Sequence, residues 1–236
     1  MTRSECILLC AAEEKAFYHG KGSTHLGGRW SEESLPWDFQ EMLRARLTGR
    51  SVFLDLGSGS CSFLLSLDPT PGLAFYAEED EEAAAILRQR FRPYGVEVRQ
   101  VFDRRDLPFS DGKFDLVYTR NGDFCPEEVC RILKRGGLFL TQQSGGVDGR
   151  FSGEAFPGWE ETARPDDLNG AITRLENAGF LVRKGQEAYP ELRFRDVGAL
   201  VYWIHAAGWQ PQDFSVEKHE EAFWQVQQRV GEKGVL

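Results

Sequence analysis

The stretch that decides the fold is Val52-Phe53-Leu54-Asp55-Leu56-Gly57-Ser58-Gly59, an apolar run closed by a glycine turn. The run 51–56 predicts a buried strand, and residues 61–67 after the turn predict a helix. Glycines let a backbone approach a ligand closely, and a helix start offers free N–H groups. The turn therefore indicates a ligand site, although turns of this kind also close ordinary strand–helix joints.

Strands and helices alternate along the chain after this junction. Each expected strand is a short β-branched or aromatic run, and each expected helix is bounded by a cap, a proline or a glycine. The alternation predicts an α/β fold, a Rossmann-like three-layer sandwich with a mostly parallel central sheet. The expected strands lie at 73–77, 96–101, 114–118, 138–142 and 180–182, and the expected helices at 81–92, 126–134 (stopping at Gly136-Gly137) and 168–178.

Two flanks extend this core, and we expect residues 1–236 to form one domain. Residues 1–48 predict an N-terminal helical segment, whose Gly- and Trp-containing part is typical of a lid. Residues 49–190 are the expected Rossmann-like core, and residues 191–236 an aromatic-rich C-terminal extension. Within the extension, 197–204 favours a buried helix over a strand, and the sequence leaves open whether a further strand closes the sheet.

Composition argues against several classes of protein. The chain is 41% hydrophobic, enough for a sizeable core, and holds no apolar run long enough to span a membrane. The five cysteines lack the spacing and the partners of a zinc site, so we expect no metal, reduced thiols and a cytoplasmic location. The formal net charge of −9 repels phosphate backbones and argues against nucleic acid as a partner.

An acidic residue supports the ligand site at the glycine turn. Glu79 follows the second expected strand and lies 24 positions after Asp55 (79 − 55). In sheets of this topology an acid at that strand end commonly holds the hydroxyls of a ribose. Glu78 and Asp80 flank it, so a solvated run of charge is the alternative interpretation.

Five motifs in register resemble the class I S-adenosylmethionine-dependent methyltransferases, in particular the group called type 11. The resemblance covers about 49–143. The motifs are the glycine-turn stretch 52–59, Glu79, Asp103-Arg104-Arg105-Asp106-Leu107-Pro108-Phe109, Phe114-Asp115-Leu116-Val117, and Leu133-Lys134-Arg135-Gly136-Gly137-Leu138-Phe139.

The resemblance implies S-adenosylmethionine as cofactor, S-adenosylhomocysteine as product, and roles for matching residues. Asp55 would orient the glycine loop and the methionine end, and Gly57, Ser58 and Gly59 would pack on the cofactor. One departure is Cys61, where the family often has a third glycine. The remaining expected contacts are Glu79 with the ribose, Asp103 and the Arg104 N–H with adenine, and Thr119, Arg120 and Asn121 beside the amino-acid end and the acceptor.

The residues also weigh against a dehydrogenase. A nicotinamide dinucleotide needs Gly-x-Gly-x-x-Gly, and position 62 is a serine. The Asp55 carboxylate ahead of the turn suits a cationic ligand better than a pyrophosphate.

No catalytic residue is assigned by the sequence, because methyl transfer needs little beyond alignment of the reactants. Residues 121–124 lack the Asn/Asp-Pro-Pro turn of amine methylation, and Cys125-Pro126 reverses the Pro-Cys of pyrimidine methylation. The candidate bases are His25, His205 and Asp123, while Trp30, Trp37 and the amides of 142–143 are candidates for contacts to cofactor or acceptor.

The sequence therefore predicts a methyltransferase acting on a small-molecule acceptor, with no membrane contact. An RNA (tRNA or rRNA) methyltransferase and a non-catalytic S-adenosylmethionine-binding protein remain as alternatives. The sequence is compatible with a homodimer.

Overall fold

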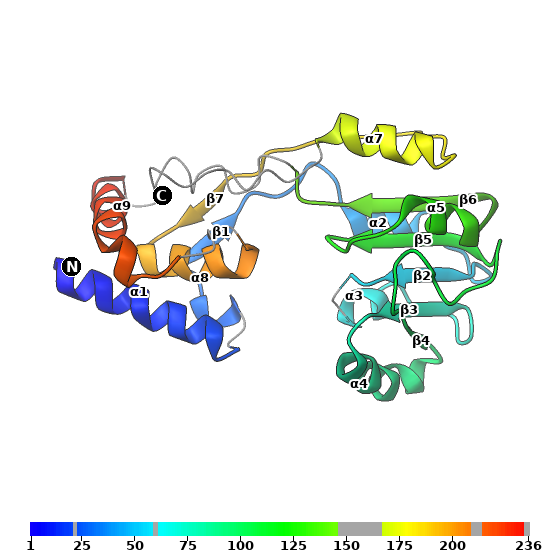
Figure 1. Ribbon diagram of the computed structural model, residues 1–236, viewed down its shortest axis with the longest axis horizontal. Helices are drawn as coiled ribbons and strands as arrows, with labels where there is room; N and C mark the ends of the chain where they lie inside the picture. Colours follow the sequence, from blue (N-terminus) through cyan, green and yellow to red (C-terminus); the bar gives the residue numbers. More distant parts are fainter. Residues whose placement is uncertain (21–22, 59–60, 146–166, 209–213, 234–236) are drawn as a thin grey trace. The chain divides into compact units, whose positions relative to one another are not determined.

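The computed structural model describes residues 1–20, 23–58, 61–145, 167–208 and 214–233 (Figure 1). Its contacts group these residues into two compact units. The sheet unit comprises 36–145 and 167–187, and the terminal unit comprises 1–35 and 188–233. The sequence predicts two separate flanks, 1–48 and 191–236, on one domain. Most residues of both flanks lie in the terminal unit.

The sheet unit is built on five parallel strands in the order β4-β3-β2-β5-β6. Strand β2 is central: β3 and then β4 lie on one side of it, and β5 and then β6 lie on the other (Figure 1). The predicted Rossmann-like α/β class is confirmed by this order. The strands are β2 (Phe53–Leu56), β3 (Ala74–Glu78), β4 (Glu97–Gln100), β5 (Phe114–Arg120) and β6 (Leu133–Gln142).

Side chains alternate between two apolar layers on the faces of this sheet. Phe53, Tyr76 and Tyr118 pack beneath α2, α3 and α4 on one face. Leu54 and Val117 pack with α5 and the loop before β5 on the other. The helices of the unit are α2 (Phe39–Arg44), α3 (Cys61–Leu65), α4 (Glu81–Phe91), α5 (Pro126–Ile132) and α7 (Leu168–Asn177), with a 3-10 turn η2 (Arg92–Tyr94).

The glycine pair 136–137 lies inside β6, not at the end of a helix. Helix α5 ends at Ile132, two residues before the predicted end, and β6 begins at once. Gly136 has φ +79°, and the pairing of β5 with β6 shifts register between Phe114 and Leu116. The glycines therefore permit a strand irregularity, which local sequence does not distinguish from a helix stop.

The strand predicted at 180–182 is wrong, since the structure assigns no strand to these residues. The Phe180 ring packs on Phe139 of β6 at 5.8 Å between centroids, while Leu181 is 79% exposed. At 180–182 the chain therefore contacts the sheet through the Phe180 side chain and does not pair with β6 as a strand. In the described chain β6 is thus an edge strand.

The terminal unit joins the two ends of the chain. Strands β1 and β7 pair antiparallel, and helix α1 packs along α8 and α9. The predicted helix at 197–204 is confirmed as α8. The elements are α1 (Arg3–Tyr18), the 3-10 turn η1 (Ser23–Leu26), β1 (Trp30–Glu32), β7 (Leu192–Phe194), α8 (Val197–Ala207), the 3-10 turn η3 (Glu217–His219) and α9 (Glu220–Lys233).

A network of charged groups crosses the terminal unit. The Arg29 guanidinium donates to both carboxylate oxygens of Asp196 at 2.6 and 2.8 Å and to Glu13 at 2.5 Å. Glu13 also contacts His25 Nε2 at 2.6 Å. The network links α1, the segment before β1 and the cap of α8, so it ties the two ends of the chain together.

Candidate functional site

The carboxyl ends of β2 and β5 define the place where a ligand is expected. These neighbouring strands lie where the strand order reverses direction, since β3 flanks β2 on the other side. In open parallel sheets the loops diverge at such a switch point and leave a crevice for a ligand. The glycine turn leaves β2 here, and the turn 121–125 leaves β5.

Asp55, the third residue of β2, is fully buried at this point. Its carboxylate accepts from the Ser58 backbone N–H at 2.9 Å, the Ser58 hydroxyl at 2.6 Å and the Tyr118 hydroxyl at 2.7 Å. Burial raises the pKa of Asp55 to about 6, while these hydrogen bonds and the charge of Arg120 oppose that rise. The carboxylate therefore holds the first half of the glycine turn.

The turns after β2 and β5 touch at two glycines. Gly57 has φ +68°, a conformation that side chains other than glycine rarely adopt. A Cβ at Gly122 would lie 3.0 Å from the carbonyl oxygens of both Leu56 and Gly57, and 2.6 Å from Thr119 Oγ1. The two turns consequently pack backbone to backbone. Gly59, the other predicted glycine, lies outside the described residues.

Thr119 and Asn121 shape the turn after β5. Thr119 is fully buried, and its hydroxyl donates to the Gly122 carbonyl at 3.4 Å. Asn121 is left-handed, with φ +55°, and its N–H donates to the Gln142 carbonyl at 2.9 Å. Non-glycine residues in this conformation cost energy and gather at functional sites, and asparagine tolerates it best.

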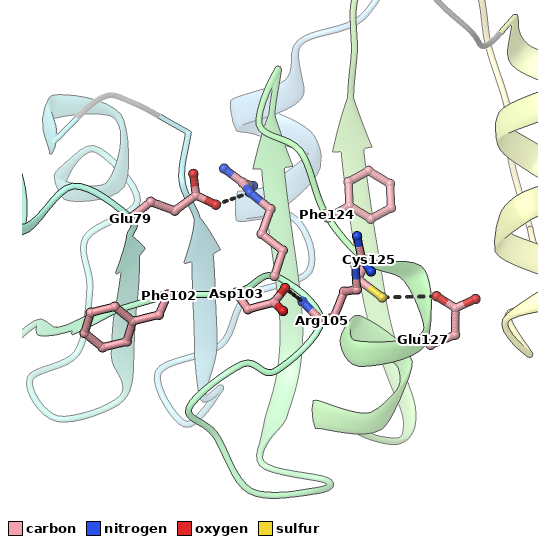
Figure 2. Close-up of a pocket in the computed structure, with 8 residues that line it drawn as sticks. Glu79, Phe102, Asp103, Arg105, Phe124, Cys125 and Glu127 are labelled. Atoms are coloured by element: carbon pink, nitrogen blue, oxygen red, sulfur yellow. Dashed lines mark hydrogen bonds and ion pairs between the residues drawn. The ribbon is translucent and has the colours of Figure 1, made fainter.

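A pocket of about 580 Å³ opens beside this crevice. Figure 2 shows that its lining side chains come from the loops that follow β3, β4 and β5 and from the first turn of α5. Its volume lies within the range usual for pockets that take small ligands. The lining residues are Glu79, Phe102, Asp103, Arg104, Arg105, Phe124, Cys125 and Glu127.

Three predicted residues meet in the pocket. The Glu79 carboxylate forms an ion pair with the Arg104 guanidinium. Asp103 accepts from the Arg105 N–H at 2.8 Å, which fixes the turn after β4. The structure thus brings Glu79, Asp103 and Arg104 together, while Asp55 and Ser58 lie in the crevice and Thr119 supports the turn from within.

The loop that carries Asp103 and Arg104 is anchored to α5. Arg131 donates to the carbonyls of Phe109 and Leu107 at 2.8 and 3.0 Å, and to Glu128 at 2.7 and 2.8 Å. Glu128 in turn accepts from the Leu107 N–H at 2.8 Å. This clamp holds one wall of the pocket in place.

Several site residues escape a reading of the sequence. Tyr118 looks like an ordinary strand aromatic, yet its hydroxyl meets Asp55. Phe102 is 88% exposed at the pocket, an unusual place for a phenylalanine. Period-two alternation along β5 could have placed Tyr118 on the face of Asp55, but no local pattern marks Phe102 or Gly122.

The candidate bases and tryptophans are dispersed. His25 belongs to the charged network, and His205 is buried under Phe17 in the terminal unit, where burial lowers its pKa. Trp30 packs on Trp203 in the same unit at 4.3 Å between ring centroids.

Asp123 and Trp37 belong to the sheet unit instead. Asp123 is exposed on the turn after β5. Trp37 Nε1 donates to Gln142 Oε1 at 3.0 Å. Of the candidate base and aromatic residues, these two therefore lie in the same unit as the glycine turn.

Residues 54–141, from β2 almost to the end of β6, match the family model described as a methyltransferase domain. The chain contains a class I methyltransferase domain. Methyl transfer is its activity, and S-adenosylmethionine is its cofactor. No curated protein matches the chain.

Solved structures show the same fold as this methyltransferase. A proposed methyltransferase from Bacillus halodurans C-125 is 21% identical over 77% of this chain and 80% of its own, with a TM-score of 0.54. The YcgJ protein from Bacillus subtilis is 18% identical over the same shares, also with a TM-score of 0.54.

Three further features of the methyltransferase concern its cysteines, possible metal ligands and helices. All five cysteines are free, with Cys6 and Cys10 buried. In the described ranges no three His, Cys, Asp or Glu side chains form a group that could hold a metal ion. None of the described helices has the length and apolar character needed to span a membrane.

Proposed function

We propose that this methyltransferase acts on a small-molecule acceptor in the cytoplasm. The observation that carries the proposal is the acidic rim of the pocket. The three loops around it expose more carboxylates than guanidinium groups, and one of the two guanidinium groups, that of Arg104, is already paired with Glu79. The exposed carboxylates are Glu79, Asp80, Asp103, Asp106, Asp123 and Glu127.

An acidic rim disfavours RNA as the acceptor. A phosphodiester backbone approaching the rim would meet like charges, and the whole chain repeats this sign with its net charge of −9. A neutral or compact acceptor avoids that repulsion. The free cysteines support a reducing compartment.

The cofactor is proposed to lie between the glycine turn and the pocket. The residues fit such a ligand: Glu79 is half exposed and offers carboxylate oxygens to hydroxyl groups, and the pocket volume suits an adenosine. The proposed contact residues are Asp55, Gly57, Ser58, Gly59, Glu79, Asp103, Arg104, Thr119 and Asn121. Of these, Thr119 would act through the turn it supports, since its side chain is buried.

The bound cofactor would supply a methyl group on a sulfonium. The protein's own contribution is then to align the acceptor and exclude water, and no general base is required unless the acceptor carries a proton. The Asp55 carboxylate places negative charge close to where a cationic ligand would lie, which favours that ligand over a pyrophosphate.

The first test is binding. Isothermal titration with S-adenosylhomocysteine should give a Kd that rises by about tenfold in Glu79→Ala, because hydrogen bonds to a charged group are lost. Glu82→Ala is the matched control, since Glu82 is an exposed acid in the first turn of α4 outside the pocket. Equal affinity of wild type and Glu79→Ala would remove Glu79 from the site.

The second test is turnover. The protein is incubated with S-adenosylmethionine and either small amines, carboxylic acids and phenols or bulk tRNA and rRNA, and S-adenosylhomocysteine release is measured. Release with a small acceptor and none with RNA supports the proposal. Release only with RNA would contradict it, and binding without any release would indicate a non-catalytic binder.

A further inference from the structure

A cation that forms no hydrogen bond or ion pair with an acid of the described chain lies at the carboxyl end of β5, although its charge is felt by Asp55. The Arg120 guanidinium carbon lies 4.8 Å from the centre of the Phe63 ring of α3. Its Nε atom is buried and has no hydrogen-bond partner, and no carboxylate of the described chain forms an ion pair with it. Buried polar groups are nearly always paired in native proteins, so an orphan donor of this kind calls for a ligand.

Asp55, a buried acid of the neighbouring strand, accepts no hydrogen bond from the Arg120 guanidinium. Asp55 and Arg120 lie on the same face of the sheet. Asp55 is the register partner of Tyr118, and Arg120 follows Tyr118 by two residues along β5, so both side chains point to the face of Tyr118. The Asp55 carboxylate already accepts three hydrogen bonds, from Ser58 and Tyr118. The guanidinium N–H groups therefore remain available.

Gln142 adds a second donor beside Arg120. The two residues are register partners in the parallel pair β5–β6, where neighbouring strands lie about 4.8 Å apart. Trp37 donates to Gln142 Oε1 at 3.0 Å, which assigns the oxygen of the amide to the tryptophan. The Gln142 NH₂ group has no partner among the described residues. Arg120 and Gln142 thus present donors only, over an aromatic surface.

We propose that Arg120 and Gln142 form a subsite for the carboxylate of a bound molecule. This inference rests on the proposed function and deepens it, because the carboxylate belongs either to the methionine end of the cofactor or to the methyl acceptor. A guanidinium and an amide together offer the planar donor geometry that a carboxylate accepts from. One positive charge matches a carboxylate, whereas a phosphate dianion would lack a second cation here.

The test compares three probes on four proteins by isothermal titration. The probes are S-adenosylhomocysteine, 5′-methylthioadenosine, which lacks the amino-acid carboxylate, and benzoate, added both to the free protein and to protein saturated with S-adenosylhomocysteine. The proteins are wild type, Arg120→Gln, Gln142→Glu and the control Arg88→Gln, an exposed arginine of α4. Gln142→Glu places a competing carboxylate beside Arg120, so it tests the subsite without removing the cation.

Two results support the subsite and identify the source of the carboxylate. If the carboxylate belongs to the cofactor, both site variants lower the affinity for S-adenosylhomocysteine by about tenfold or more and leave the affinity for 5′-methylthioadenosine unchanged. If it belongs to the acceptor, both adenosine ligands bind all proteins equally, and the site variants lose about tenfold or more in benzoate affinity.

Two results would overturn it. In the first, the site variants lower the affinity for both adenosine ligands alike, as a purely structural role predicts. In the second, the site variants bind every probe as wild type and Arg88→Gln do. Failure of the proposed function is separate: wild type would then bind neither adenosine ligand, and benzoate on the free protein would still decide the subsite.

Discussion

The sheet unit and the terminal unit are assembled from different kinds of contact. In the sheet unit most neighbouring strands follow one another in the sequence, as β2 and β3 do, although β2 also pairs with β5, and the site lies on the turns after these strands. In the terminal unit β1 pairs with β7, and α1 packs on α8, across the whole of the sheet unit's sequence. The comparison teaches that cofactor binding and the stability of the terminal unit should respond to different substitutions.

The largest expected effects come from matched leucines in the two cores. Leu54 of β2 and Leu200 of α8 are both fully buried, so each change to alanine should cost about 2–5 kcal/mol of unfolding free energy. Leu54→Ala should also abolish binding of S-adenosylhomocysteine, because β2 carries Asp55. Leu200→Ala should leave that binding intact.

Urea denaturation and isothermal titration measure both effects. If Leu200→Ala lowers the affinity for S-adenosylhomocysteine as much as Leu54→Ala does, the two units fold as one, and the proposed difference between them is wrong.

The next effect is a pH dependence confined to the sheet unit. Burial raises the pKa of Asp55 from 3.8 to about 6, so the folded state binds more protons than the unfolded state between these values. Wild type should therefore lose about 3 kcal/mol of unfolding free energy relative to Asp55→Asn as the pH rises from 3 to 8. Urea midpoints of both proteins across this range measure the loss, and a stability of wild type relative to Asp55→Asn that stays constant or increases with pH contradicts the raised pKa of the buried carboxylate.

A smaller effect is expected at the charged network of the terminal unit. Arg29→Ala leaves Glu13 and Asp196 without their cation, and should cost about 2–3 kcal/mol, because partial exposure of the guanidinium reduces the penalty of a broken buried pair. The control is Arg3→Ala, whose ion pair with Glu221 is exposed and worth less than about 1 kcal/mol.

Thermal unfolding followed by tryptophan fluorescence should report the loss in Arg29→Ala, since Trp30 lies in this unit. Unchanged affinity for S-adenosylhomocysteine sharpens the contrast between units. A weakened affinity would show that the charged network reaches the site.

The smallest effect is expected from the Tyr118 hydroxyl. Tyr118→Phe removes one of three hydrogen bonds to Asp55 and should cost about 1–2 kcal/mol, with a raised Kd for S-adenosylhomocysteine because the glycine turn is less firmly held. Tyr94→Phe, at an exposed tyrosine of the sheet unit, is the control. Stability and affinity equal to those of the control would mean that Ser58 alone orders the turn.

The sequence predicts most of the sheet unit because its signals are local. Apolar runs closed by turns mark β2 to β5, and Pro126 marks the start of α5. The errors occur where partners distant in sequence decide, as at the Gly136-Gly137 irregularity and at 180–182. The pairing of β1 with β7 has no local signal at all.

For the site, the sequence predicts identities better than contacts. Glu79, Asp103 and Arg104 do gather around one pocket, but the ion pair between Glu79 and Arg104 depends on side-chain geometry that spacing does not give. The close packing of Gly122 on the glycine turn likewise follows from the neighbouring positions of β2 and β5. Motifs name residues, whereas the sheet order decides which of them touch.

The split of the terminal unit across the chain sets an order of events during synthesis on the ribosome. The sheet unit's strands have all been made once β6 emerges, and they can pair while the rest is translated. Helix α1 is made first, yet its buried stripe of Cys6, Cys10 and Ala16 must wait for α8 and α9, which are made last. Helix α1 therefore keeps this stripe uncovered while the whole of the sheet unit is translated, which makes the stripe a target for a chaperone.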